Sequence, residues 1–281
     1  DVKDGLTILQ AALQNGIFIP HYCWHPGLSL AGNCRMCIVK VSTSKKLEAS
    51  CMIKCAEGMT VETEAPEVVK ARENVLEYML INHPIDCPVC DKAGECDLQD
   101  FTFKHRGGLS RFQENKVIKH TKDLGSTIKI WGNRCIVCTR CVRFCNEIAG
   151  EGELAVVNRG DHSVVDTFPG IPLENKLSLN TVDLCPVGAL IGKDFLYQAR
   201  VWFLEKSETI CPSCSRGCNI TLSTIKGKVK RMEPRLNMEI NQYWMCDDGR
   251  LNYKYVNSDR RLTKVKGAAS SEEAVRFRAL A

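Results

Sequence analysis

The sequence contains 17 cysteines, and many of them stand only two or three residues apart. Disulfides rarely join residues spaced so tightly, and the number is odd, so reduced thiols that bind metal are the better interpretation. Thiolates are soft, anionic ligands that suit iron–sulfur clusters. Together with one histidine, the cysteines fall into four sets with the spacing of cluster ligands. The sequence therefore predicts four iron–sulfur clusters and an electron-carrying role.

The first set lies within the N-terminal third of the chain, and Gly32 lies in the loop that carries its middle members. Gly32 and the short residues beside it would let the loop wrap a cluster closely and point backbone N–H groups at its sulfurs. This spacing is typical of 2Fe–2S ferredoxins, although it differs somewhat from the plant-type pattern. The four members are Cys23, Cys34, Cys37 and Cys51.

The second set has only three cysteines, Cys87, Cys90 and Cys96, which leaves a four-iron cluster one ligand short. His83 precedes them at loop range and is a chemically acceptable fourth ligand. Lone histidines more often pack in a structural role, so the spacing leaves both interpretations of His83 open.

The third set gives the strongest signal. Cys135, Cys138 and Cys141 stand at two-residue gaps, and the distant Cys185 is followed by Pro186. Three closely spaced cysteines can bind neighbouring corners of a four-iron cube, with a distant cysteine before proline as the fourth ligand.

The fourth set is again complete and consists of Cys211, Cys214, Cys218 and Cys246. Structural zinc sites also use cysteine pairs at two-residue gaps, so zinc is an open alternative here. Two cysteines, Cys55 and Cys145, fall outside all four sets, and we expect them to be ordinary small packing residues. The other histidines have no companion ligands in pattern.

Periodicity predicts an α+β fold. The apolar spacing indicates helices near residues 6–16 and 67–82, with Gly16 and Pro84 placed to end them. Short β-branched runs predict strands at 38–41 and 60–63. Two hairpins are expected, and they cover residues 154–166 and 220–232. We interpret the N-terminal part as a 2Fe–2S ferredoxin-like (β-grasp) domain, followed by small loop-rich cluster modules.

This pattern divides the chain into five segments. We expect a 2Fe–2S domain, a His/Cys3 4Fe–4S module, a ferredoxin-like 4Fe–4S module, an additional 4Fe–4S module and a tail or linker. Their predicted ranges are 1–81, 82–130, 131–206, 207–262 and 263–281.

Composition narrows the function class. The net charge of +5 is a weak basic excess, and we expect no nucleic acid among the partners. No apolar run approaches the length of a membrane span, so we expect no direct span. No nucleophile–base pair, phosphate loop or paired-carboxylate site stands out, and we expect no catalytic residues.

Four strings, in this order, resemble the large iron–sulfur subunit of bacterial respiratory complex I (NADH:quinone oxidoreductase). They are Gly-Asn-Cys-Arg-Met-Cys at 32–37, His-Pro-Ile-Asp-Cys-Pro-Val-Cys at 83–90, Arg-Cys-Ile-Val-Cys-Thr-Arg-Cys-Val-Arg-Phe at 134–144 and Asp-Leu-Cys-Pro-Val-Gly-Ala-Leu at 183–190. The resemblance covers roughly residues 1–262 and implies that His83 is a ligand. It implies one 2Fe–2S cluster in the first set and three 4Fe–4S clusters in the others, the last being an additional cluster that only some bacterial members have.

The resemblance also implies where the chain acts in electron transfer and where it lies in the cell. It would relay electrons from the flavin- and NADH-bearing subunit towards the quinone-side iron–sulfur subunits, as part of an oxidoreductase. Its location would be the peripheral arm on the cytoplasmic side of the bacterial inner membrane. Family members usually continue into a domain similar to molybdopterin enzymes, so this chain is expected to be a short or truncated form.

Two related families are alternatives: the large subunits of NAD-linked formate dehydrogenases and of iron hydrogenases. The formate dehydrogenases usually have lysine two residues after the last cysteine, where this chain has Asp248. The hydrogenases need further cysteines for a catalytic cluster, and none follow Cys246.

Overall fold

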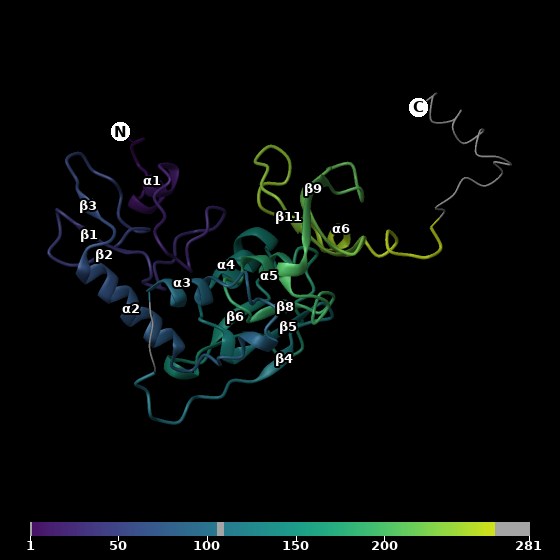
Figure 1. The fold of residues 1–281 in the computed structure, drawn as a ribbon, viewed down its shortest axis with the longest axis horizontal. Helices are drawn as coiled ribbons and strands as arrows, with labels where there is room; N and C mark the ends of the chain where they lie inside the picture. The colour runs from purple at the N-terminus through teal and green to yellow at the C-terminus, as the bar shows by residue number, and fades with distance from the viewer. Residues whose placement is uncertain (1, 106–109, 262–281) are drawn as a thin grey trace.

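The computed structural model describes residues 2–105 and 110–261, so the predicted tail at 263–281 lies outside the described residues. The predicted α+β class is confirmed. Helix α1 and the first sheet lie at one end of the molecule, whereas α4, α5, β5 and β8 lie near its centre (Figure 1). Most of the chain between the sheets consists of loops and single turns.

In the N-terminal unit, a three-stranded sheet in the order β2-β1-β3 packs against α1. The side chain of Thr7 accepts a hydrogen bond from the backbone of Gln10, and the Gln10 side chain accepts one from the backbone of Thr7. This capping box fixes the start of α1. The bounds are Ile8–Gln14 for α1, Ile38–Val41 for β1, Glu48–Ala49 for β2 and Val61–Glu62 for β3.

Helix α2 (Pro66–Leu80) leads from this unit to the next, close to the helix predicted at 67–82. Pro66 occupies the first turn, where its missing N–H costs nothing. The buried side chains of Val68, Arg72 and Leu76 mark the face that packs inward.

The middle of the chain is more regular than the loop-rich segment that the sequence predicts for 83–130. Helix α3 (Asp97–His105) buries only Leu98 and Phe101, which is too short an apolar pattern to reveal a helix in the sequence. A second sheet has the order β4-β5-β8, and β8 comes from about 60 residues further along the chain. The bounds are Thr121–Asp123 for β4, Ile128–Trp131 for β5 and Leu190–Gly192 for β8.

The predicted hairpin at 154–166 is confirmed as β6 (Leu154–Val157) paired with β7 (Val164–Thr167). Two short helices, α4 (Arg140–Phe144) and α5 (Asn180–Leu184), pack together in the same region. A single π-helical turn, Cys145–Ala149, continues α4.

The last unit is a sheet in the order β11-β10-β9, followed by α6 (Asp247–Leu251). The predicted hairpin is confirmed as β10 (Asn219–Ile225) and β11 (Lys228–Pro234), with β9 (Glu205–Ile210) on the other edge of β10. The connecting Lys226 and Gly227 both have positive φ, as a two-residue type I′ turn requires.

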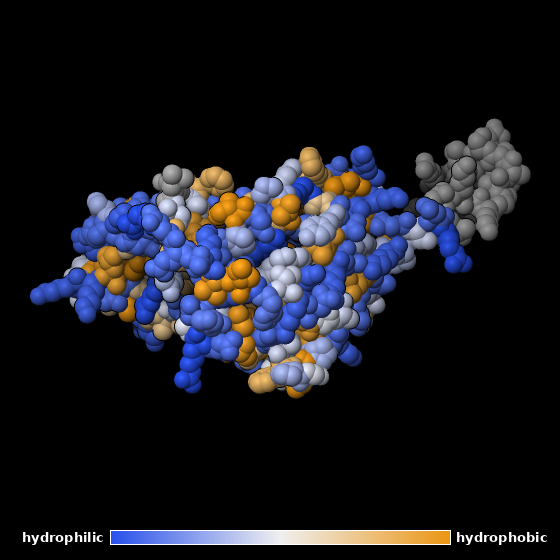
Figure 2. Space-filling model, turned by 90° about the horizontal axis from the view of Figure 1, so that it is seen from below, coloured by the Kyte–Doolittle hydropathy of each residue, from blue (hydrophilic) through white to orange (hydrophobic). Residues whose placement is uncertain are grey.

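Buried hydrophobic residues form three clusters. One belongs to the N-terminal sheet, one to the last sheet, and the largest joins residues from Tyr22 to Leu190 in a single core. On the face that Figure 2 shows, hydrophobic residues lie in separate small patches among hydrophilic ones. Among the described residues, no helix combines the length and the apolar character needed to cross a bilayer.

Candidate iron–sulfur centres

The loop before β1 and the turn after β2 bring the first set together. All four cysteines are buried, and the thiol of Cys23 lies within hydrogen-bonding contact of Cys34 and Cys51, while Cys37 contacts Cys51. These contacts hold the pKa of Cys23 below its ordinary value and raise the pKa of Cys51. Arg35 adopts a left-handed backbone with φ 57, which bends the loop between two of the cysteines.

The second set lies around a single turn of 3-10 helix, Cys87–Val89, and the start of α3. The Nδ1 atom of His83 is buried and has no hydrogen-bond partner. Burial lowers the pKa of His83 to about 4, so the imidazole is neutral at pH 7, which is the form that binds metal. An unpartnered buried nitrogen costs free energy unless it receives a partner, and iron would provide one.

Backbone from the third module packs directly against this second set. A Cβ atom placed on Gly188 would lie 2.2 Å from the Sγ of Cys90. Arg134 fixes the surroundings because its guanidinium pairs with Asp86 at 2.5 Å and stacks on Trp131 at 4.9 Å. Gly188 and Arg134 therefore help to shape the space beside Cys90.

The third set lines one small cavity, which lies between α4 and the loop after α5. Val137 and Thr139 both have positive φ, so the backbone curls between the cysteines, and the N–H of Val137 donates to the Sγ of Cys135 at 3.4 Å. Burial raises the pKa of Cys138 to about 12, and the positive charge of Arg140 opposes that rise. The members that line the cavity are Cys135, Cys138, Cys141 and Cys185.

The fourth set lies between β9, β10 and α6. Cys246 precedes α6, and its sulfur accepts a hydrogen bond from the N–H of Gly249 at 3.3 Å. A Cβ on Gly249 would stand 3.1 Å from the Sγ of Cys211 and 3.3 Å from that of Cys246. Cys218 interacts electrostatically with Cys211, Cys214 and Cys246, and Cys214 alone among the four is exposed.

Several features of the donor sets bear on which metal group they fit. Within residues 2–105 and 110–261, no group of three or more His, Cys, Asp or Glu side chains converges to hold a single metal ion. The four-thiol cavity of the third set, the unpartnered His83 nitrogen and the glycines against Cys90 and Cys246 all fit clusters. The ligand roles of the 16 residues stay predictions.

The two remaining cysteines differ from each other in how deeply they are buried. Cys55 is partly buried beside the core of the N-terminal sheet. Cys145 is completely buried one helical turn after Cys141, and burial raises its pKa to about 12. Neither lines the cavity of the third set.

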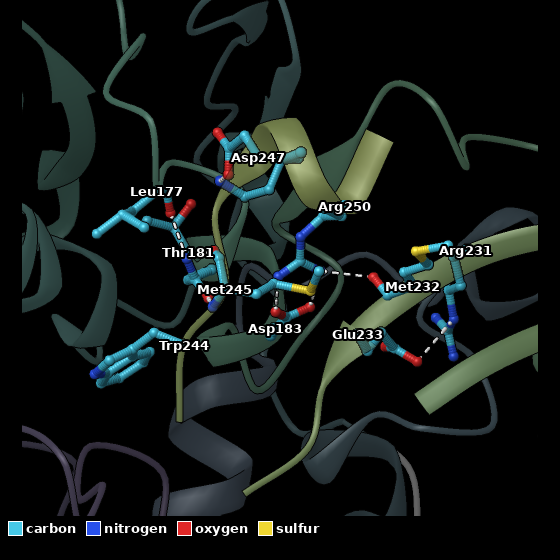
Figure 3. Close-up of polar contacts among 12 residues, drawn as sticks. Leu177, Thr181, Asp183, Arg231, Met232, Glu233, Trp244, Met245, Asp247 and Arg250 are labelled. Atoms are coloured by element: carbon cyan, nitrogen blue, oxygen red, sulfur yellow. Dashed lines mark hydrogen bonds and ion pairs between the residues drawn. The ribbon is translucent and has the colours of Figure 1, made fainter. Parts of the chain in front are cut away.

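Sequence reasoning missed a set of buried arginines that lie near the candidate ligands. Arg250, for example, donates to both carboxylate oxygens of Asp183 and to the backbone oxygen of Met232, which ties α6 to α5 and β11 (Figure 3). Arg231 pairs in the same way with Glu95, which precedes Cys96. Thus two bidentate pairs join the last unit to the middle of the chain. In the sequence, the available sign of such a buried arginine is its position beside or between cysteines.

Comparison with family models matches four segments in order. Residues 1–66 match a 2Fe-2S iron-sulfur cluster binding domain, and residues 72–108 match an NADH-ubiquinone oxidoreductase-G iron-sulfur binding region. Residues 125–191 match the ferredoxin-like domain of NADH-quinone oxidoreductase subunit 3, and residues 204–258 match a molybdopterin oxidoreductase Fe4S4 domain.

Two curated relatives extend this similarity. The G-type subunit of NADH-quinone oxidoreductase from Rickettsia prowazekii is 42% identical over 94% of this chain, and the NADH-ubiquinone oxidoreductase 75 kDa subunit of Reclinomonas americana is 45% identical over 92%. The chain spans about two fifths of their length, 41% and 38% respectively.

Among solved structures, a chain of an NAD+-reducing [NiFe]-hydrogenase in the H2-reduced state is similar. It has a TM-score of 0.65 and 30% sequence identity, and the match covers 71% of this chain and 86% of that one.

Proposed function

We propose that, over the part of these relatives that it matches, the chain belongs to the G-type subunit family of NADH-quinone oxidoreductase and is an electron-transfer unit of such a complex. It would carry electrons between iron–sulfur clusters and make or break no substrate bonds itself. The share of the relatives' length that it spans makes the activity of the whole complex part of the same proposal.

One observation carries this proposal. Candidate ligands from three different sets belong to one continuous buried core: Cys23 and Cys34 from the first, Cys96 from the second, and Cys138, Cys141 and Cys185 from the third. Clusters held there would be close neighbours in a medium from which water is excluded. Those are the conditions in which the protein, through burial and hydrogen bonds to sulfur, sets reduction potentials.

The family models show cluster-binding domains of both the 2Fe–2S and the 4Fe–4S type. We propose the finer assignment of one 2Fe–2S cluster on the first set and three 4Fe–4S clusters on the others. When bound, such clusters supply reversible one-electron storage. The chain's own residues orient the ligands, exclude water and donate N–H groups to sulfur, as Val137 and Gly249 do.

The fourth set is a different case, because two of its cysteines, Cys211 and Cys218, belong to a separate core with β10, β11 and Tyr253. This separation supports the interpretation of its cluster as a side cluster rather than a step on the main route. The predicted boundaries, 1–81, 82–130, 131–206 and 207–262, are part of the proposal, with one cluster in each segment.

The partners follow from the same premise. We propose that a flavin- and NADH-binding subunit delivers electrons to the first cluster, and that quinone-side iron–sulfur subunits receive them. The complex would lie on the cytoplasmic side of a bacterial inner membrane, with this chain in its peripheral arm.

A second candidate rests on the similarity to the NAD+-reducing hydrogenase chain. There the same clusters would connect a hydrogenase centre to a flavin subunit. The NADH-quinone oxidoreductase relatives match a larger share of this chain at higher identity, so they support the first candidate more strongly.

Anaerobic purification with metal analysis and electron paramagnetic resonance tests the proposal. We expect about 14 iron atoms per chain at full loading and several distinct signals after reduction with dithionite. NADH alone should leave the clusters oxidised, and NADH with the flavin subunit should reduce them. A colourless chain that contains zinc would contradict the proposal, and reduction driven only by hydrogen with a hydrogenase subunit would favour the second candidate.

The unusual ligand of the second set gives a further prediction. A neutral imidazole leaves its cluster with one negative charge fewer than a thiolate would, so we expect His83→Cys to lower the midpoint potential of that cluster. A redox titration followed by electron paramagnetic resonance measures this change, and an unchanged or higher midpoint would contradict it. The other clusters in the same sample are the internal control.

A further inference from the structure

Arg140 is a buried arginine at the point where the first and third ligand sets meet. It begins α4 between Cys138 and Cys141, and it lines the cavity of the third set. One guanidinium nitrogen donates to the backbone oxygen of Leu184 at 3.3 Å, and the other donates to the backbone oxygen of Trp24 at 2.6 Å. Leu184 and Trp24 are the sequence neighbours of Cys185 and Cys23, so one side chain joins both sets.

Arg140 differs from the other buried arginines in what balances its charge. Arg72 pairs with Glu64, Arg134 with Asp86 and Arg250 with Asp183. Within the part of the chain that the structure describes, no carboxylate lies within ion-pairing distance of Arg140, and its Nε has no hydrogen-bond partner. A buried cation that has only neutral carbonyl partners is costly, because burial removes its hydration.

The ionisable groups around Arg140 show how far the electric field of its guanidinium extends. His21 and His25, which flank Cys23, and Asp97, which follows Cys96, all interact electrostatically with Arg140. On its own helix, Arg143 donates to the backbone oxygens of Ser29 and Cys23. The positive charge of Arg140 therefore reaches the neighbourhoods of three ligand sets.

We propose that Arg140 is the positioning residue between the first and third clusters and the countercharge that raises the reduction potentials of both. This inference rests on the proposed function. A cluster with four thiolates is an anion, and it gains one more negative charge when it accepts an electron. A cation buried at its edge stabilises the reduced form more than the oxidised form, since nearby charges interact strongly at low dielectric constant.

The variants Arg140→Gln and Arg140→Lys, made in the complete chain or complex, test this role. For Arg140→Gln, we expect the equilibrium constant for one-electron reduction of the third cluster to fall about tenfold to a hundredfold. A tenfold fall corresponds to about 59 mV. The first cluster should shift in the same direction by a smaller factor, because Arg140 reaches only the backbone beside Cys23. Redox titration followed by electron paramagnetic resonance measures both clusters in one sample.

Arg140→Lys separates charge from geometry, because lysine keeps the charge but lacks the planar fork that serves two carbonyls. We expect both equilibrium constants to stay within about threefold of the wild type. The matched control is Arg159→Gln, which removes the same charge from an exposed position after β6. It should leave both potentials unchanged.

The outcomes are distinct. A tenfold fall in Arg140→Lys, or unchanged potentials in Arg140→Gln, would overturn the electrostatic role. If Arg140→Gln fails to retain its clusters, the reduction potentials of Arg140→Lys alone decide whether the electrostatic role holds. A wild-type chain that shows neither cluster signal would instead contradict the proposed function, not the role of Arg140.

Discussion

Replacing Cys141 with alanine abolishes the third cluster and leaves the chain with about four iron atoms fewer, whereas the same replacement of Cys145 leaves the iron content unchanged. This is the expected result with the largest effect on function. The two cysteines are four residues apart, and both are buried. Only Cys141 lines the cavity that Cys135, Cys138 and Cys185 share.

The physical reason is the direction of the side chains. Cys141 interacts electrostatically with the three other members of its set and less strongly with Cys145, whereas the pKa of Cys145 responds mainly to burial and to Glu153. Three thiolates hold a four-iron cluster poorly, and the ligands of this set share one core with ligands of the first two sets. We therefore expect NADH-driven electron flow through the chain to fall by about a hundredfold or more in Cys141→Ala.

Cys145→Ala is the matched control, because it removes one buried sulfur from the same region. A small cavity there should cost about 1 kcal/mol of unfolding free energy. Iron analysis and the signal of the third cluster are the measurements. If Cys145→Ala lost the cluster while Cys141→Ala retained it, the assignment of this ligand set would be wrong.

The second large effect is expected for Gly188→Ala. A Cβ at this position would lie 2.2 Å from the Sγ of Cys90 and 3.2 Å from the Cβ of Lys92. Cys90 cannot turn away without leaving its cluster, so either the backbone around Gly188 moves or the second cluster is lost. Overpacking of this kind costs about 1–3 kcal/mol in unfolding free energy.

We expect Gly188→Ala to lose the signal of the second cluster and to unfold at lower denaturant concentration. Gly192→Ala is a suitable control, because the nearest atom to its Cβ would be the flexible Cδ2 of Leu179 at 3.3 Å. A Gly188→Ala chain with the second cluster and wild-type stability would show that Cys90 does not need its present position.

Some of the fold could be predicted because the signal was local. Pro66 and the apolar spacing after it located α2 to within a few residues, and the β-branched runs on both sides of Gly160 and Gly227 located two hairpins. Pairings between distant segments could not be predicted in this way. Strand β8 pairs with β5 across about 60 residues, and no local pattern specifies that partner.

The candidate site likewise has a part that the sequence predicts and a part that it does not. The sequence by itself predicted the donor atoms and their grouping, because residue type and spacing are covalent properties of the chain. Only the tertiary structure decided that ligands from three sets share one core, that Gly188 lies against Cys90, and that Arg140 stands unpaired between two sets. Those relations depend on which distant segments pack together. Burial then makes the charge of an arginine or the missing side chain of a glycine energetically important, and the neighbouring residues in the sequence do not reveal this.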